Sequence, residues 1–263
     1  MKIPSVSLNI LHFLSQSPTN ANVLKFTITK NVRDSMDAKM KLGIFLVLFS
    51  LVSLVLFNVK LFYIVGSESK YFTMFQFIGP IGGGLFSPLI GVLSVLLVEL
   101  LANINSGIPL DALKLVQMFL PMVFAAYYFG AIKNNQKLTF VLPVLGMLLF
   151  WLNPIGREAW GYPLLWLIPI VAGYFSKNLF ARSLATTFQA HIIGSVAWLY
   201  ATGMAAPLWW GLIPVVLFER TIFACGISAT YIAFNTLLEA VSALTKTDFS
   251  FMNIEKKYAL IKL

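Results

Sequence analysis

Charged residues and cysteine are both scarce in this sequence, and each shortage narrows the class of protein. Only 11% of the 263 residues are charged, whereas 59% are hydrophobic. A chain with this balance cannot bury its apolar surface in a water-soluble core of ordinary proportions, so we expect an integral membrane protein. The one cysteine, Cys225, excludes an internal disulfide and a metal site made of several thiolates. We expect neither a metal nor another cofactor.

Sequence patterns of catalysis and energy conversion are missing as well. The chain has no G-x-x-x-x-G-K-[ST] motif, and therefore no P-loop with which to drive transport by itself. It also has no G-x-S-x-G and no H-E-x-x-H motif. We therefore expect that the protein is not an enzyme. Two alternatives stay open: an intramembrane, thiol-dependent transpeptidase-like enzyme that uses Cys225, His191 and Arg220, and a noncatalytic structural or assembly subunit.

The chain does contain a series of apolar runs, each close to the roughly 20 residues that a bilayer crossing needs. Their order predicts an all-α fold, a polytopic membrane helical bundle with about six full crossings plus a glycine-rich broken helix or hairpin. The predicted crossings span residues 42–59, 110–132, 138–152, 162–175, 184–202 and 208–241, and the broken segment spans residues 73–102.

The broken segment contains the run FIGPIGGGLFSPLIGVLSVLLVELLAN, in which glycines and prolines interrupt apolar residues. Lipid cannot satisfy the backbone N–H and C=O groups of a break, so the break must be buried in protein or line a cavity. Transporters commonly place binding sites in such spans. We expect the chain to turn at residues 82–84, and the recurring small residues to pack closely against a neighbouring helix. The predicted hinge consists of Gly79, Pro80, Gly82, Gly83, Gly84 and Gly91.

The net charge of +9 is concentrated at the two ends and in short loops. It divides the chain into a basic cytoplasmic leader at residues 1–41, a transmembrane helical domain at 42–245 and a basic cytoplasmic tail at 246–263. Cytoplasmic loops are enriched in lysine and arginine, and a broken segment that returns to the face it entered places the loops with Lys133, Lys177 and Arg182 on that side. We therefore predict a multi-pass cell-membrane protein with both termini cytoplasmic, whose basic ends contact anionic lipid and not nucleic acid.

The adjacent Glu219 and Arg220 are the strongest candidates for a functional site. A charged group at this depth costs roughly 2.5 to 3.5 kcal/mol, so such groups usually pair or line a site. Adjacent residues point about 100° apart on a helix, and we expect each to find its own partner. Arg220 is expected to hold an anionic substrate group, and Glu219 to engage His191 or a backbone donor. A structural ion network is the alternative.

Five further polar or aromatic residues are predicted to bind substrate. Glu99 lies at the end of an apolar run, where a carboxylate is either solvated or faces a cavity, and Asn103 is one turn further on the same face. His191 lies in mid-span, with Ser195 and Trp198 along its helical face. This face indicates either a polar pocket or ordinary packing. The predicted substrate-binding residues, including the adjacent pair, are Glu99, Asn103, Gln189, His191, Trp198, Glu219 and Arg220.

The run TMFQFIGPIGGGLFSPLIGVLSVLLVELLAN, followed by LDALKLVQMFLPMVFAAYYFG, resembles the early part of the substrate-binding S components of energy-coupling factor (ECF) vitamin transporters. Gly79, Pro80, Gly83 and Gly91 fit the glycine-proline pattern of their broken early helix. The resemblance implies a membrane bundle that captures a vitamin-like small molecule for uptake. It also implies a transmembrane coupling subunit and ATPase subunits as partners.

Overall fold

The computed structural model describes residues 18–63, 71–106, 112–246 and 248–261, so the first 17 residues of the predicted leader lie outside it. The chain divides into two units, one ending at Phe45 and one spanning Leu46–Leu263. The helix α2 (Pro18–Phe57) passes through the boundary predicted between leader and transmembrane domain. That boundary stays a prediction. The second unit contains the candidate site residues described below.

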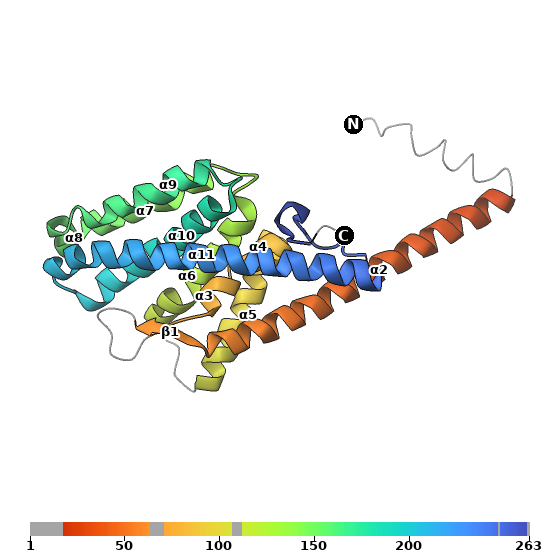
Figure 1. Ribbon diagram of the computed structural model, residues 1–263, viewed down its shortest axis with the longest axis horizontal. Helices are drawn as coiled ribbons and strands as arrows, with labels where there is room; N and C mark the ends of the chain where they lie inside the picture. Colours follow the sequence, from red (N-terminus) through yellow and green to blue (C-terminus); the bar gives the residue numbers. More distant parts are fainter. Residues whose placement is uncertain (1–17, 64–70, 107–111, 247, 262–263) are drawn as a thin grey trace, which may run out of the picture. The chain divides into compact units, whose positions relative to one another are not determined.

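Helices make up most of the described chain, and its two strands, β1 (Lys60–Tyr63) and β2 (Tyr71–Thr73), form one short antiparallel hairpin that was not predicted (Figure 1). The hairpin leads into α3 (Phe75–Ile78), α4 (Ile81–Leu85), α5 (Pro88–Ser106), α6 (Ala112–Ala131), α7 (Leu138–Leu152), α8 (Pro154–Glu158), the 3-10 helix η1 (Tyr162–Trp166), α9 (Leu167–Tyr174), α10 (Leu179–Thr202), α11 (Ala206–Thr245) and the 3-10 helix η2 (Lys256–Tyr258).

The helices confirm a helical membrane protein. Three of them contain segments long and apolar enough to cross a bilayer, at Lys39–Phe57, Pro88–Asn105 and Ala206–Thr245. Shorter apolar helices lie at Phe119–Ala131, Leu138–Leu152 and Tyr162–Tyr174. A 15-residue helix such as α7 is about 22 Å long, less than the roughly 30 Å of a bilayer core. The predicted number of six full crossings therefore stays a prediction.

The segment is interrupted twice, by a turn at Gly79 and Pro80 of the predicted hinge, between α3 and α4, and by a second turn just after the predicted glycines. Residues 82–84 are helical in α4, and the chain turns at Phe86 and Ser87. The predicted turn at the glycines is therefore wrong, because proline and serine fix the boundary instead. Pro88 occupies the first helical position of α5, where its missing N–H costs nothing, and Ser87 Oγ accepts a hydrogen bond from the Ile90 N–H at 3.3 Å.

The glycines of the segment permit close packing of three helices, as predicted for the small residues. A Cβ atom added to Gly83 of α4 would meet the backbone carbonyl of Ala126 in α6. A Cβ added to Gly91 of α5 or to Gly130 of α6 would meet the backbone of Gly83. Backbones approach this closely only where no side chain intervenes.

The helix α10 lies at the centre of the second unit, beside α6, α7, α9 and α11 (Figure 1). Its buried residues are unusually polar for a membrane protein and include Arg182, Ser183, Thr186, Thr187, Gln189 and Ser195. Large apolar side chains such as Leu89, Leu148 and Phe218 are instead exposed on the surrounding helices. The polar groups that could bind a ligand are therefore gathered inside the bundle.

Candidate functional site

An aromatic core positions the first part of the candidate site. Tyr162 of η1 is 1% exposed and packs against the rings of Phe150 and Trp209, with centroid distances of 5.4 and 4.8 Å. Its hydroxyl lies 3.1 Å from His191 Nε2 and 3.3 Å from Ser195 Oγ. The Ser195 hydroxyl and His191 Nε2 are 3.2 Å apart. His191 and Ser195 share a helical face as predicted, and that face carries a connected polar group.

Arg220 forms the second part of the site and is 2% exposed. Its Nη1 donates to Thr187 Oγ1 at 3.3 Å, and its Nη2 lies 3.4 Å from Glu219 Oε2. The guanidinium also lies over the rings of Phe223 and Phe72, at 4.3 and 5.1 Å. Within the described part of the chain, its Nε has no hydrogen-bond partner.

The prediction that Glu219 and Arg220 each find a separate partner is wrong for this pair. The long arginine side chain reaches back to the neighbouring carboxylate, although the two residues leave the helix in different directions. The expected contact between Glu219 and His191 is replaced by the contacts of His191 with Tyr162 and Ser195. Thr187, which accepts the hydrogen bond from Arg220, precedes His191 by one turn of α10, so the two parts adjoin on the same helix. We call Tyr162, Thr187, His191, Ser195, Glu219 and Arg220 the interior polar cluster.

The other four predicted substrate-binding residues are not members of this cluster. Gln189 is 1% exposed and close to the Tyr128 hydroxyl, and in the described part of the chain neither of its amide atoms makes a hydrogen bond of ordinary geometry. Trp198 packs against the aromatic core. Glu99 and Asn103 share a buried face of α5, which packs against α4 and α6. At 3% exposure, Glu99 does not fit the solvated alternative.

The sequence reading missed Tyr162 and Thr187. Tyr162 begins the 3-10 helix η1, and nothing local to the sequence indicates that its hydroxyl meets a residue of α10 that lies 29 positions later. Thr187 precedes His191 by one helical turn, so the shared face could have identified it.

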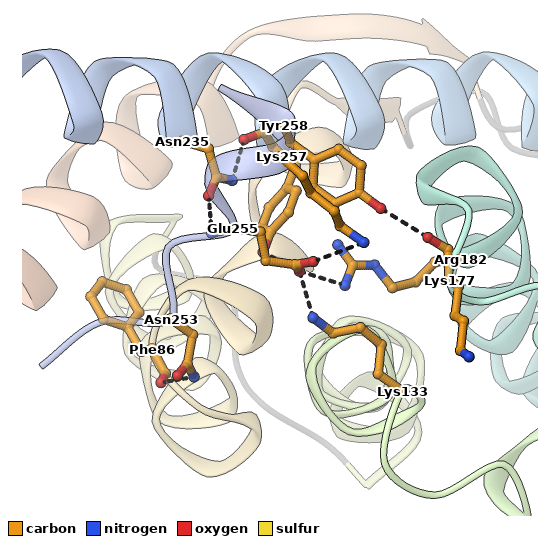
Figure 2. Close-up of polar contacts among 10 residues, drawn as sticks. Phe86, Lys133, Lys177, Arg182, Asn235, Asn253, Glu255, Lys257 and Tyr258 are labelled. Atoms are coloured by element: carbon orange, nitrogen blue, oxygen red, sulfur yellow. Dashed lines mark hydrogen bonds and ion pairs between the residues drawn. The ribbon is translucent and has the colours of Figure 1, made fainter. Parts of the chain in front are cut away.

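A second polar group lies where the C-terminal segment returns to the bundle (Figure 2). Glu255 Oε1 contacts Lys133 Nζ at 2.6 Å and Arg182 Nη1 at 2.9 Å, and its Oε2 lies 3.5 Å from Lys257 Nζ. The Tyr231 hydroxyl donates to Glu255 Oε1 at 2.8 Å. We call Lys133, Arg182, Tyr231, Glu255 and Lys257 the tail cluster. Burial raises the pKa of Glu255, but the hydrogen bond from Lys133 and the charge of Arg182 outweigh burial and lower the pKa to about 2.

The C-terminal segment that carries Glu255 also donates hydrogen bonds to the backbone at the break between α4 and α5. The Asn253 N–H donates to the Leu85 carbonyl, and the Asn253 side-chain amide donates to the Phe86 carbonyl, both at 2.7 Å (Figure 2). The last carbonyls of a helix have no partner within it, so these two bonds satisfy groups that lipid could not. The break is buried against protein as expected, and its partner is the tail.

The tail cluster was also missed, because Lys133 and Arg182 were read only as charges of cytoplasmic loops. One signal was available. Asn178 caps α10 by accepting a hydrogen bond from the Ala181 N–H, so the helix begins five residues earlier than predicted and includes Arg182. No local pattern links either residue to Glu255.

The fold and the two clusters define the class of protein as a helical membrane protein with a polar interior. Within the described residues, no group of histidine, cysteine and carboxylate side chains could hold a metal ion. No known protein family matches the chain, and neither does any solved structure. The chain is 26% identical over 191 residues to an uncharacterized protein of Methanocaldococcus jannaschii. The match covers 66% of this chain and 63% of that protein.

Proposed function

We propose that the protein captures a small anionic molecule at the interior polar cluster, as the substrate-binding component of an uptake transporter for a vitamin-like compound. The observation that carries this proposal is that Arg220 is buried but incompletely paired. Its guanidinium is buried, its ion pair with Glu219 is long at 3.4 Å, and one of its nitrogens lacks a partner in the described chain.

A buried cation of this kind is costly unless it is well paired. The planar guanidinium offers several donors in a fixed geometry that suits a carboxylate or phosphate. A ligand anion would complete the pairing that Glu219 leaves incomplete. The hydroxyls of Tyr162 and Ser195 and the imidazole of His191 then supply hydrogen bonds that orient the rest of the ligand.

The resemblance to S components supports the wider role, including the ATPase and coupling subunits that a chain without a P-loop needs. We also propose that the chain crosses the membrane six times and that both termini lie in the cytoplasm. The thiol-enzyme alternative has less support, because Cys225 is exposed whereas Arg220 on the same helix is buried. A thiolate that is directed away from the arginine cannot share a reaction centre with it.

A thermal-shift screen of the purified protein against vitamins, other carboxylates and phosphorylated metabolites tests the proposal. A ligand at 100 times its Kd stabilises the native state by about 2.7 kcal/mol. We expect a stabilising compound whose effect is lost in Arg220→Gln and kept in Thr221→Val. Thr221 is the adjacent, exposed residue, and the hydrogen bond that its hydroxyl makes in the described chain goes to the Leu217 carbonyl of the same helix, so it provides a matched control.

Two results would count against the proposal. A folded protein that no anionic compound stabilises would favour the structural-subunit alternative. A compound that stabilises Arg220→Gln as well as the wild type would place binding elsewhere.

A further inference from the structure

The tail cluster contains more positive charge than its one carboxylate can neutralise. Lys133, Arg182 and Lys257 all contact Glu255, and this leaves an excess of two positive charges. The neighbouring Glu239 does not reduce the excess, because it pairs with Lys256. Figure 2 shows the three cationic groups converging on the Glu255 carboxylate.

The Arg182 side chain is fixed by its neighbours and still has hydrogen-bond donors that a ligand could use. Its side chain has no exposed surface, and its guanidinium lies 4.2 Å from the ring of Phe129 and 4.8 Å from that of Tyr231. Of its five N–H donors, the one on Nη1 that faces Glu255 is used, whereas Nε and Nη2 make no hydrogen bond within the described chain. The guanidinium is therefore fixed by aromatic packing and retains unused donors.

We propose that Lys133, Arg182, Tyr231 and Lys257 form a phosphate-binding site that Glu255 occupies as an intramolecular ligand. A phosphate group carries a charge of about −1.5 to −2 and three strong acceptor oxygens, which suits both the excess charge and the unused guanidinium donors better than one carboxylate does. The Lys133 and Lys257 side chains are 33% and 56% exposed, so the site is open to a ligand from solvent. Free phosphate and the headgroup of an anionic lipid share this chemistry.

Binding at this site displaces the Glu255 carboxylate and loosens the segment around it, while the long, half-exposed Lys257 side chain can stay in contact with the bound phosphate. Glu255 is part of a segment whose backbone N–H groups make specific bonds: Asn253 to the Leu85 carbonyl, Glu255 to Asn235 Oδ1, and Leu260 to Thr236 Oγ1. When phosphate replaces the carboxylate, the segment is held less firmly and these hydrogen bonds open more often. The occupancy of the site can therefore be followed in the wild-type protein.

The first experiment measures hydrogen exchange of the amides of Asn253, Glu255 and Leu260 in the full chain in a zwitterionic detergent. The probes are inorganic phosphate, short-chain phosphatidylglycerol and, as a control, short-chain phosphatidylcholine. We expect faster exchange of these amides with phosphatidylglycerol, with phosphate or with both. An effect of phosphatidylglycerol alone identifies a lipid headgroup as the ligand, and an effect of phosphate identifies the free ion. Unchanged exchange with both, or an equal effect of phosphatidylcholine, would overturn the proposal.

The second experiment measures the affinity for whichever probe is active, in variants of the cluster. Glu255→Gln removes the competing charge and should bind about tenfold more tightly, which corresponds to the loss of one charge-assisted contact. Lys133→Gln should bind at least about tenfold more weakly. Lys137→Gln makes the same charge change in the same exposed loop and should match the wild type.

Equal weakening in Lys133→Gln and Lys137→Gln would mean unspecific attraction to a basic surface and would contradict the proposal. If Glu255→Gln does not fold, the comparison of Lys133→Gln with Lys137→Gln and the wild-type exchange experiment still decide between the outcomes.

Discussion

At the scale of single residues, two buried arginines on adjacent helices have different surroundings. Arg182 lies 2.9 Å from a carboxylate and between aromatic rings, whereas the carboxylate nearest to Arg220 is 3.4 Å away. Charge-assisted hydrogen bonds are strongest at about 2.7–2.9 Å. The one contact that Arg182 makes with Glu255 is therefore short, although its Nε and Nη2 make no hydrogen bond in the described chain, whereas the contact of Arg220 with Glu219 is long. This contrast is why we assign substrate capture to Arg220.

The Glu255 carboxyl gives a pH prediction. Its pKa in the folded protein is about 2, below its ordinary value of 4.5, so the ionised form is favoured by folding. Its contribution to stability is present above pH 4.5 and is lost as the pH falls from 4.5 toward 2. We expect the melting temperature of the wild type to fall more steeply over this window than that of Glu255→Gln. Parallel curves would contradict the pairing.

The Asn253 side chain gives a stability prediction. Asn253→Ala leaves the Phe86 carbonyl without its donor, and an unsatisfied buried polar group costs about 1–3 kcal/mol. Thermal unfolding in detergent should show a clear loss of stability, whereas Asn134→Ala at an exposed loop position should be close to neutral. A neutral Asn253→Ala would mean that the tail does not satisfy the break.

At the scale of elements, the helix break is fixed by several independent features. Ser87 and Pro88 begin α5, and glycines allow α4, α5 and α6 to approach closely. The tail then supplies donors to the end of α4. A break whose Leu85 and Phe86 carbonyls have protein partners is the kind that a membrane tolerates.

The close packing of α4, α5 and α6 can be tested by a glycine-to-alanine substitution, which adds one methyl group. In Gly83→Ala the new Cβ would overlap the Ala126 carbonyl, so we expect a loss of several kcal/mol or failure to fold, as for severe overpacking. Gly194→Ala is the matched control, because no atom lies within 4 Å of the added Cβ. It should be neutral or stabilising by up to about 1 kcal/mol, the helix propensity of alanine over glycine. Similar melting temperatures for the two variants would contradict the packing described.

Helices were predictable wherever apolar length alone determines them. The predicted segment at residues 138–152 coincides with α7, and that at 162–175 covers η1 and α9. The start of α10 was placed too late, because its first turns are polar yet buried. The hairpin of β1 and β2 was not predicted, since it depends on packing of Phe62 and Phe72 against Phe223, more than 150 residues away.

The candidate site was predictable only in part. His191, Glu219 and Arg220 could be identified because they lie within predicted membrane-spanning runs, where a polar side chain is energetically costly. The partners of His191 and of Arg182 were not predictable, since Tyr162 and Glu255 reach these two residues through tertiary structure. Contacts across such sequence separations leave no periodic pattern in one sequence.

At the scale of the whole molecule, polarity is distributed in the sense opposite to that of a water-soluble protein. The central helix α10 buries polar side chains, and the surrounding helices expose leucine, valine and phenylalanine. Exposed apolar area of this extent is suited to lipid. This arrangement supports a membrane bundle independently of hydropathy.

The proposed topology can be tested by cysteine labelling in a Cys225→Ser background. Residues 134 and 157 lie beyond opposite ends of α7, and the positive-inside rule places the first in the cytoplasm. A membrane-impermeant maleimide should label Arg157→Cys in intact cells and Asn134→Cys only after permeabilisation. The reverse pattern would invert the topology.

The most direct test of substrate capture is calorimetric titration of the purified wild type, Arg220→Gln and Thr221→Val with the most strongly stabilising anion. The account predicts that binding is at least about 100-fold weaker in Arg220→Gln, the order expected when a buried charged contact is removed, and that Thr221→Val keeps the wild-type affinity. Equal affinity in the wild type and a folded Arg220→Gln would contradict it.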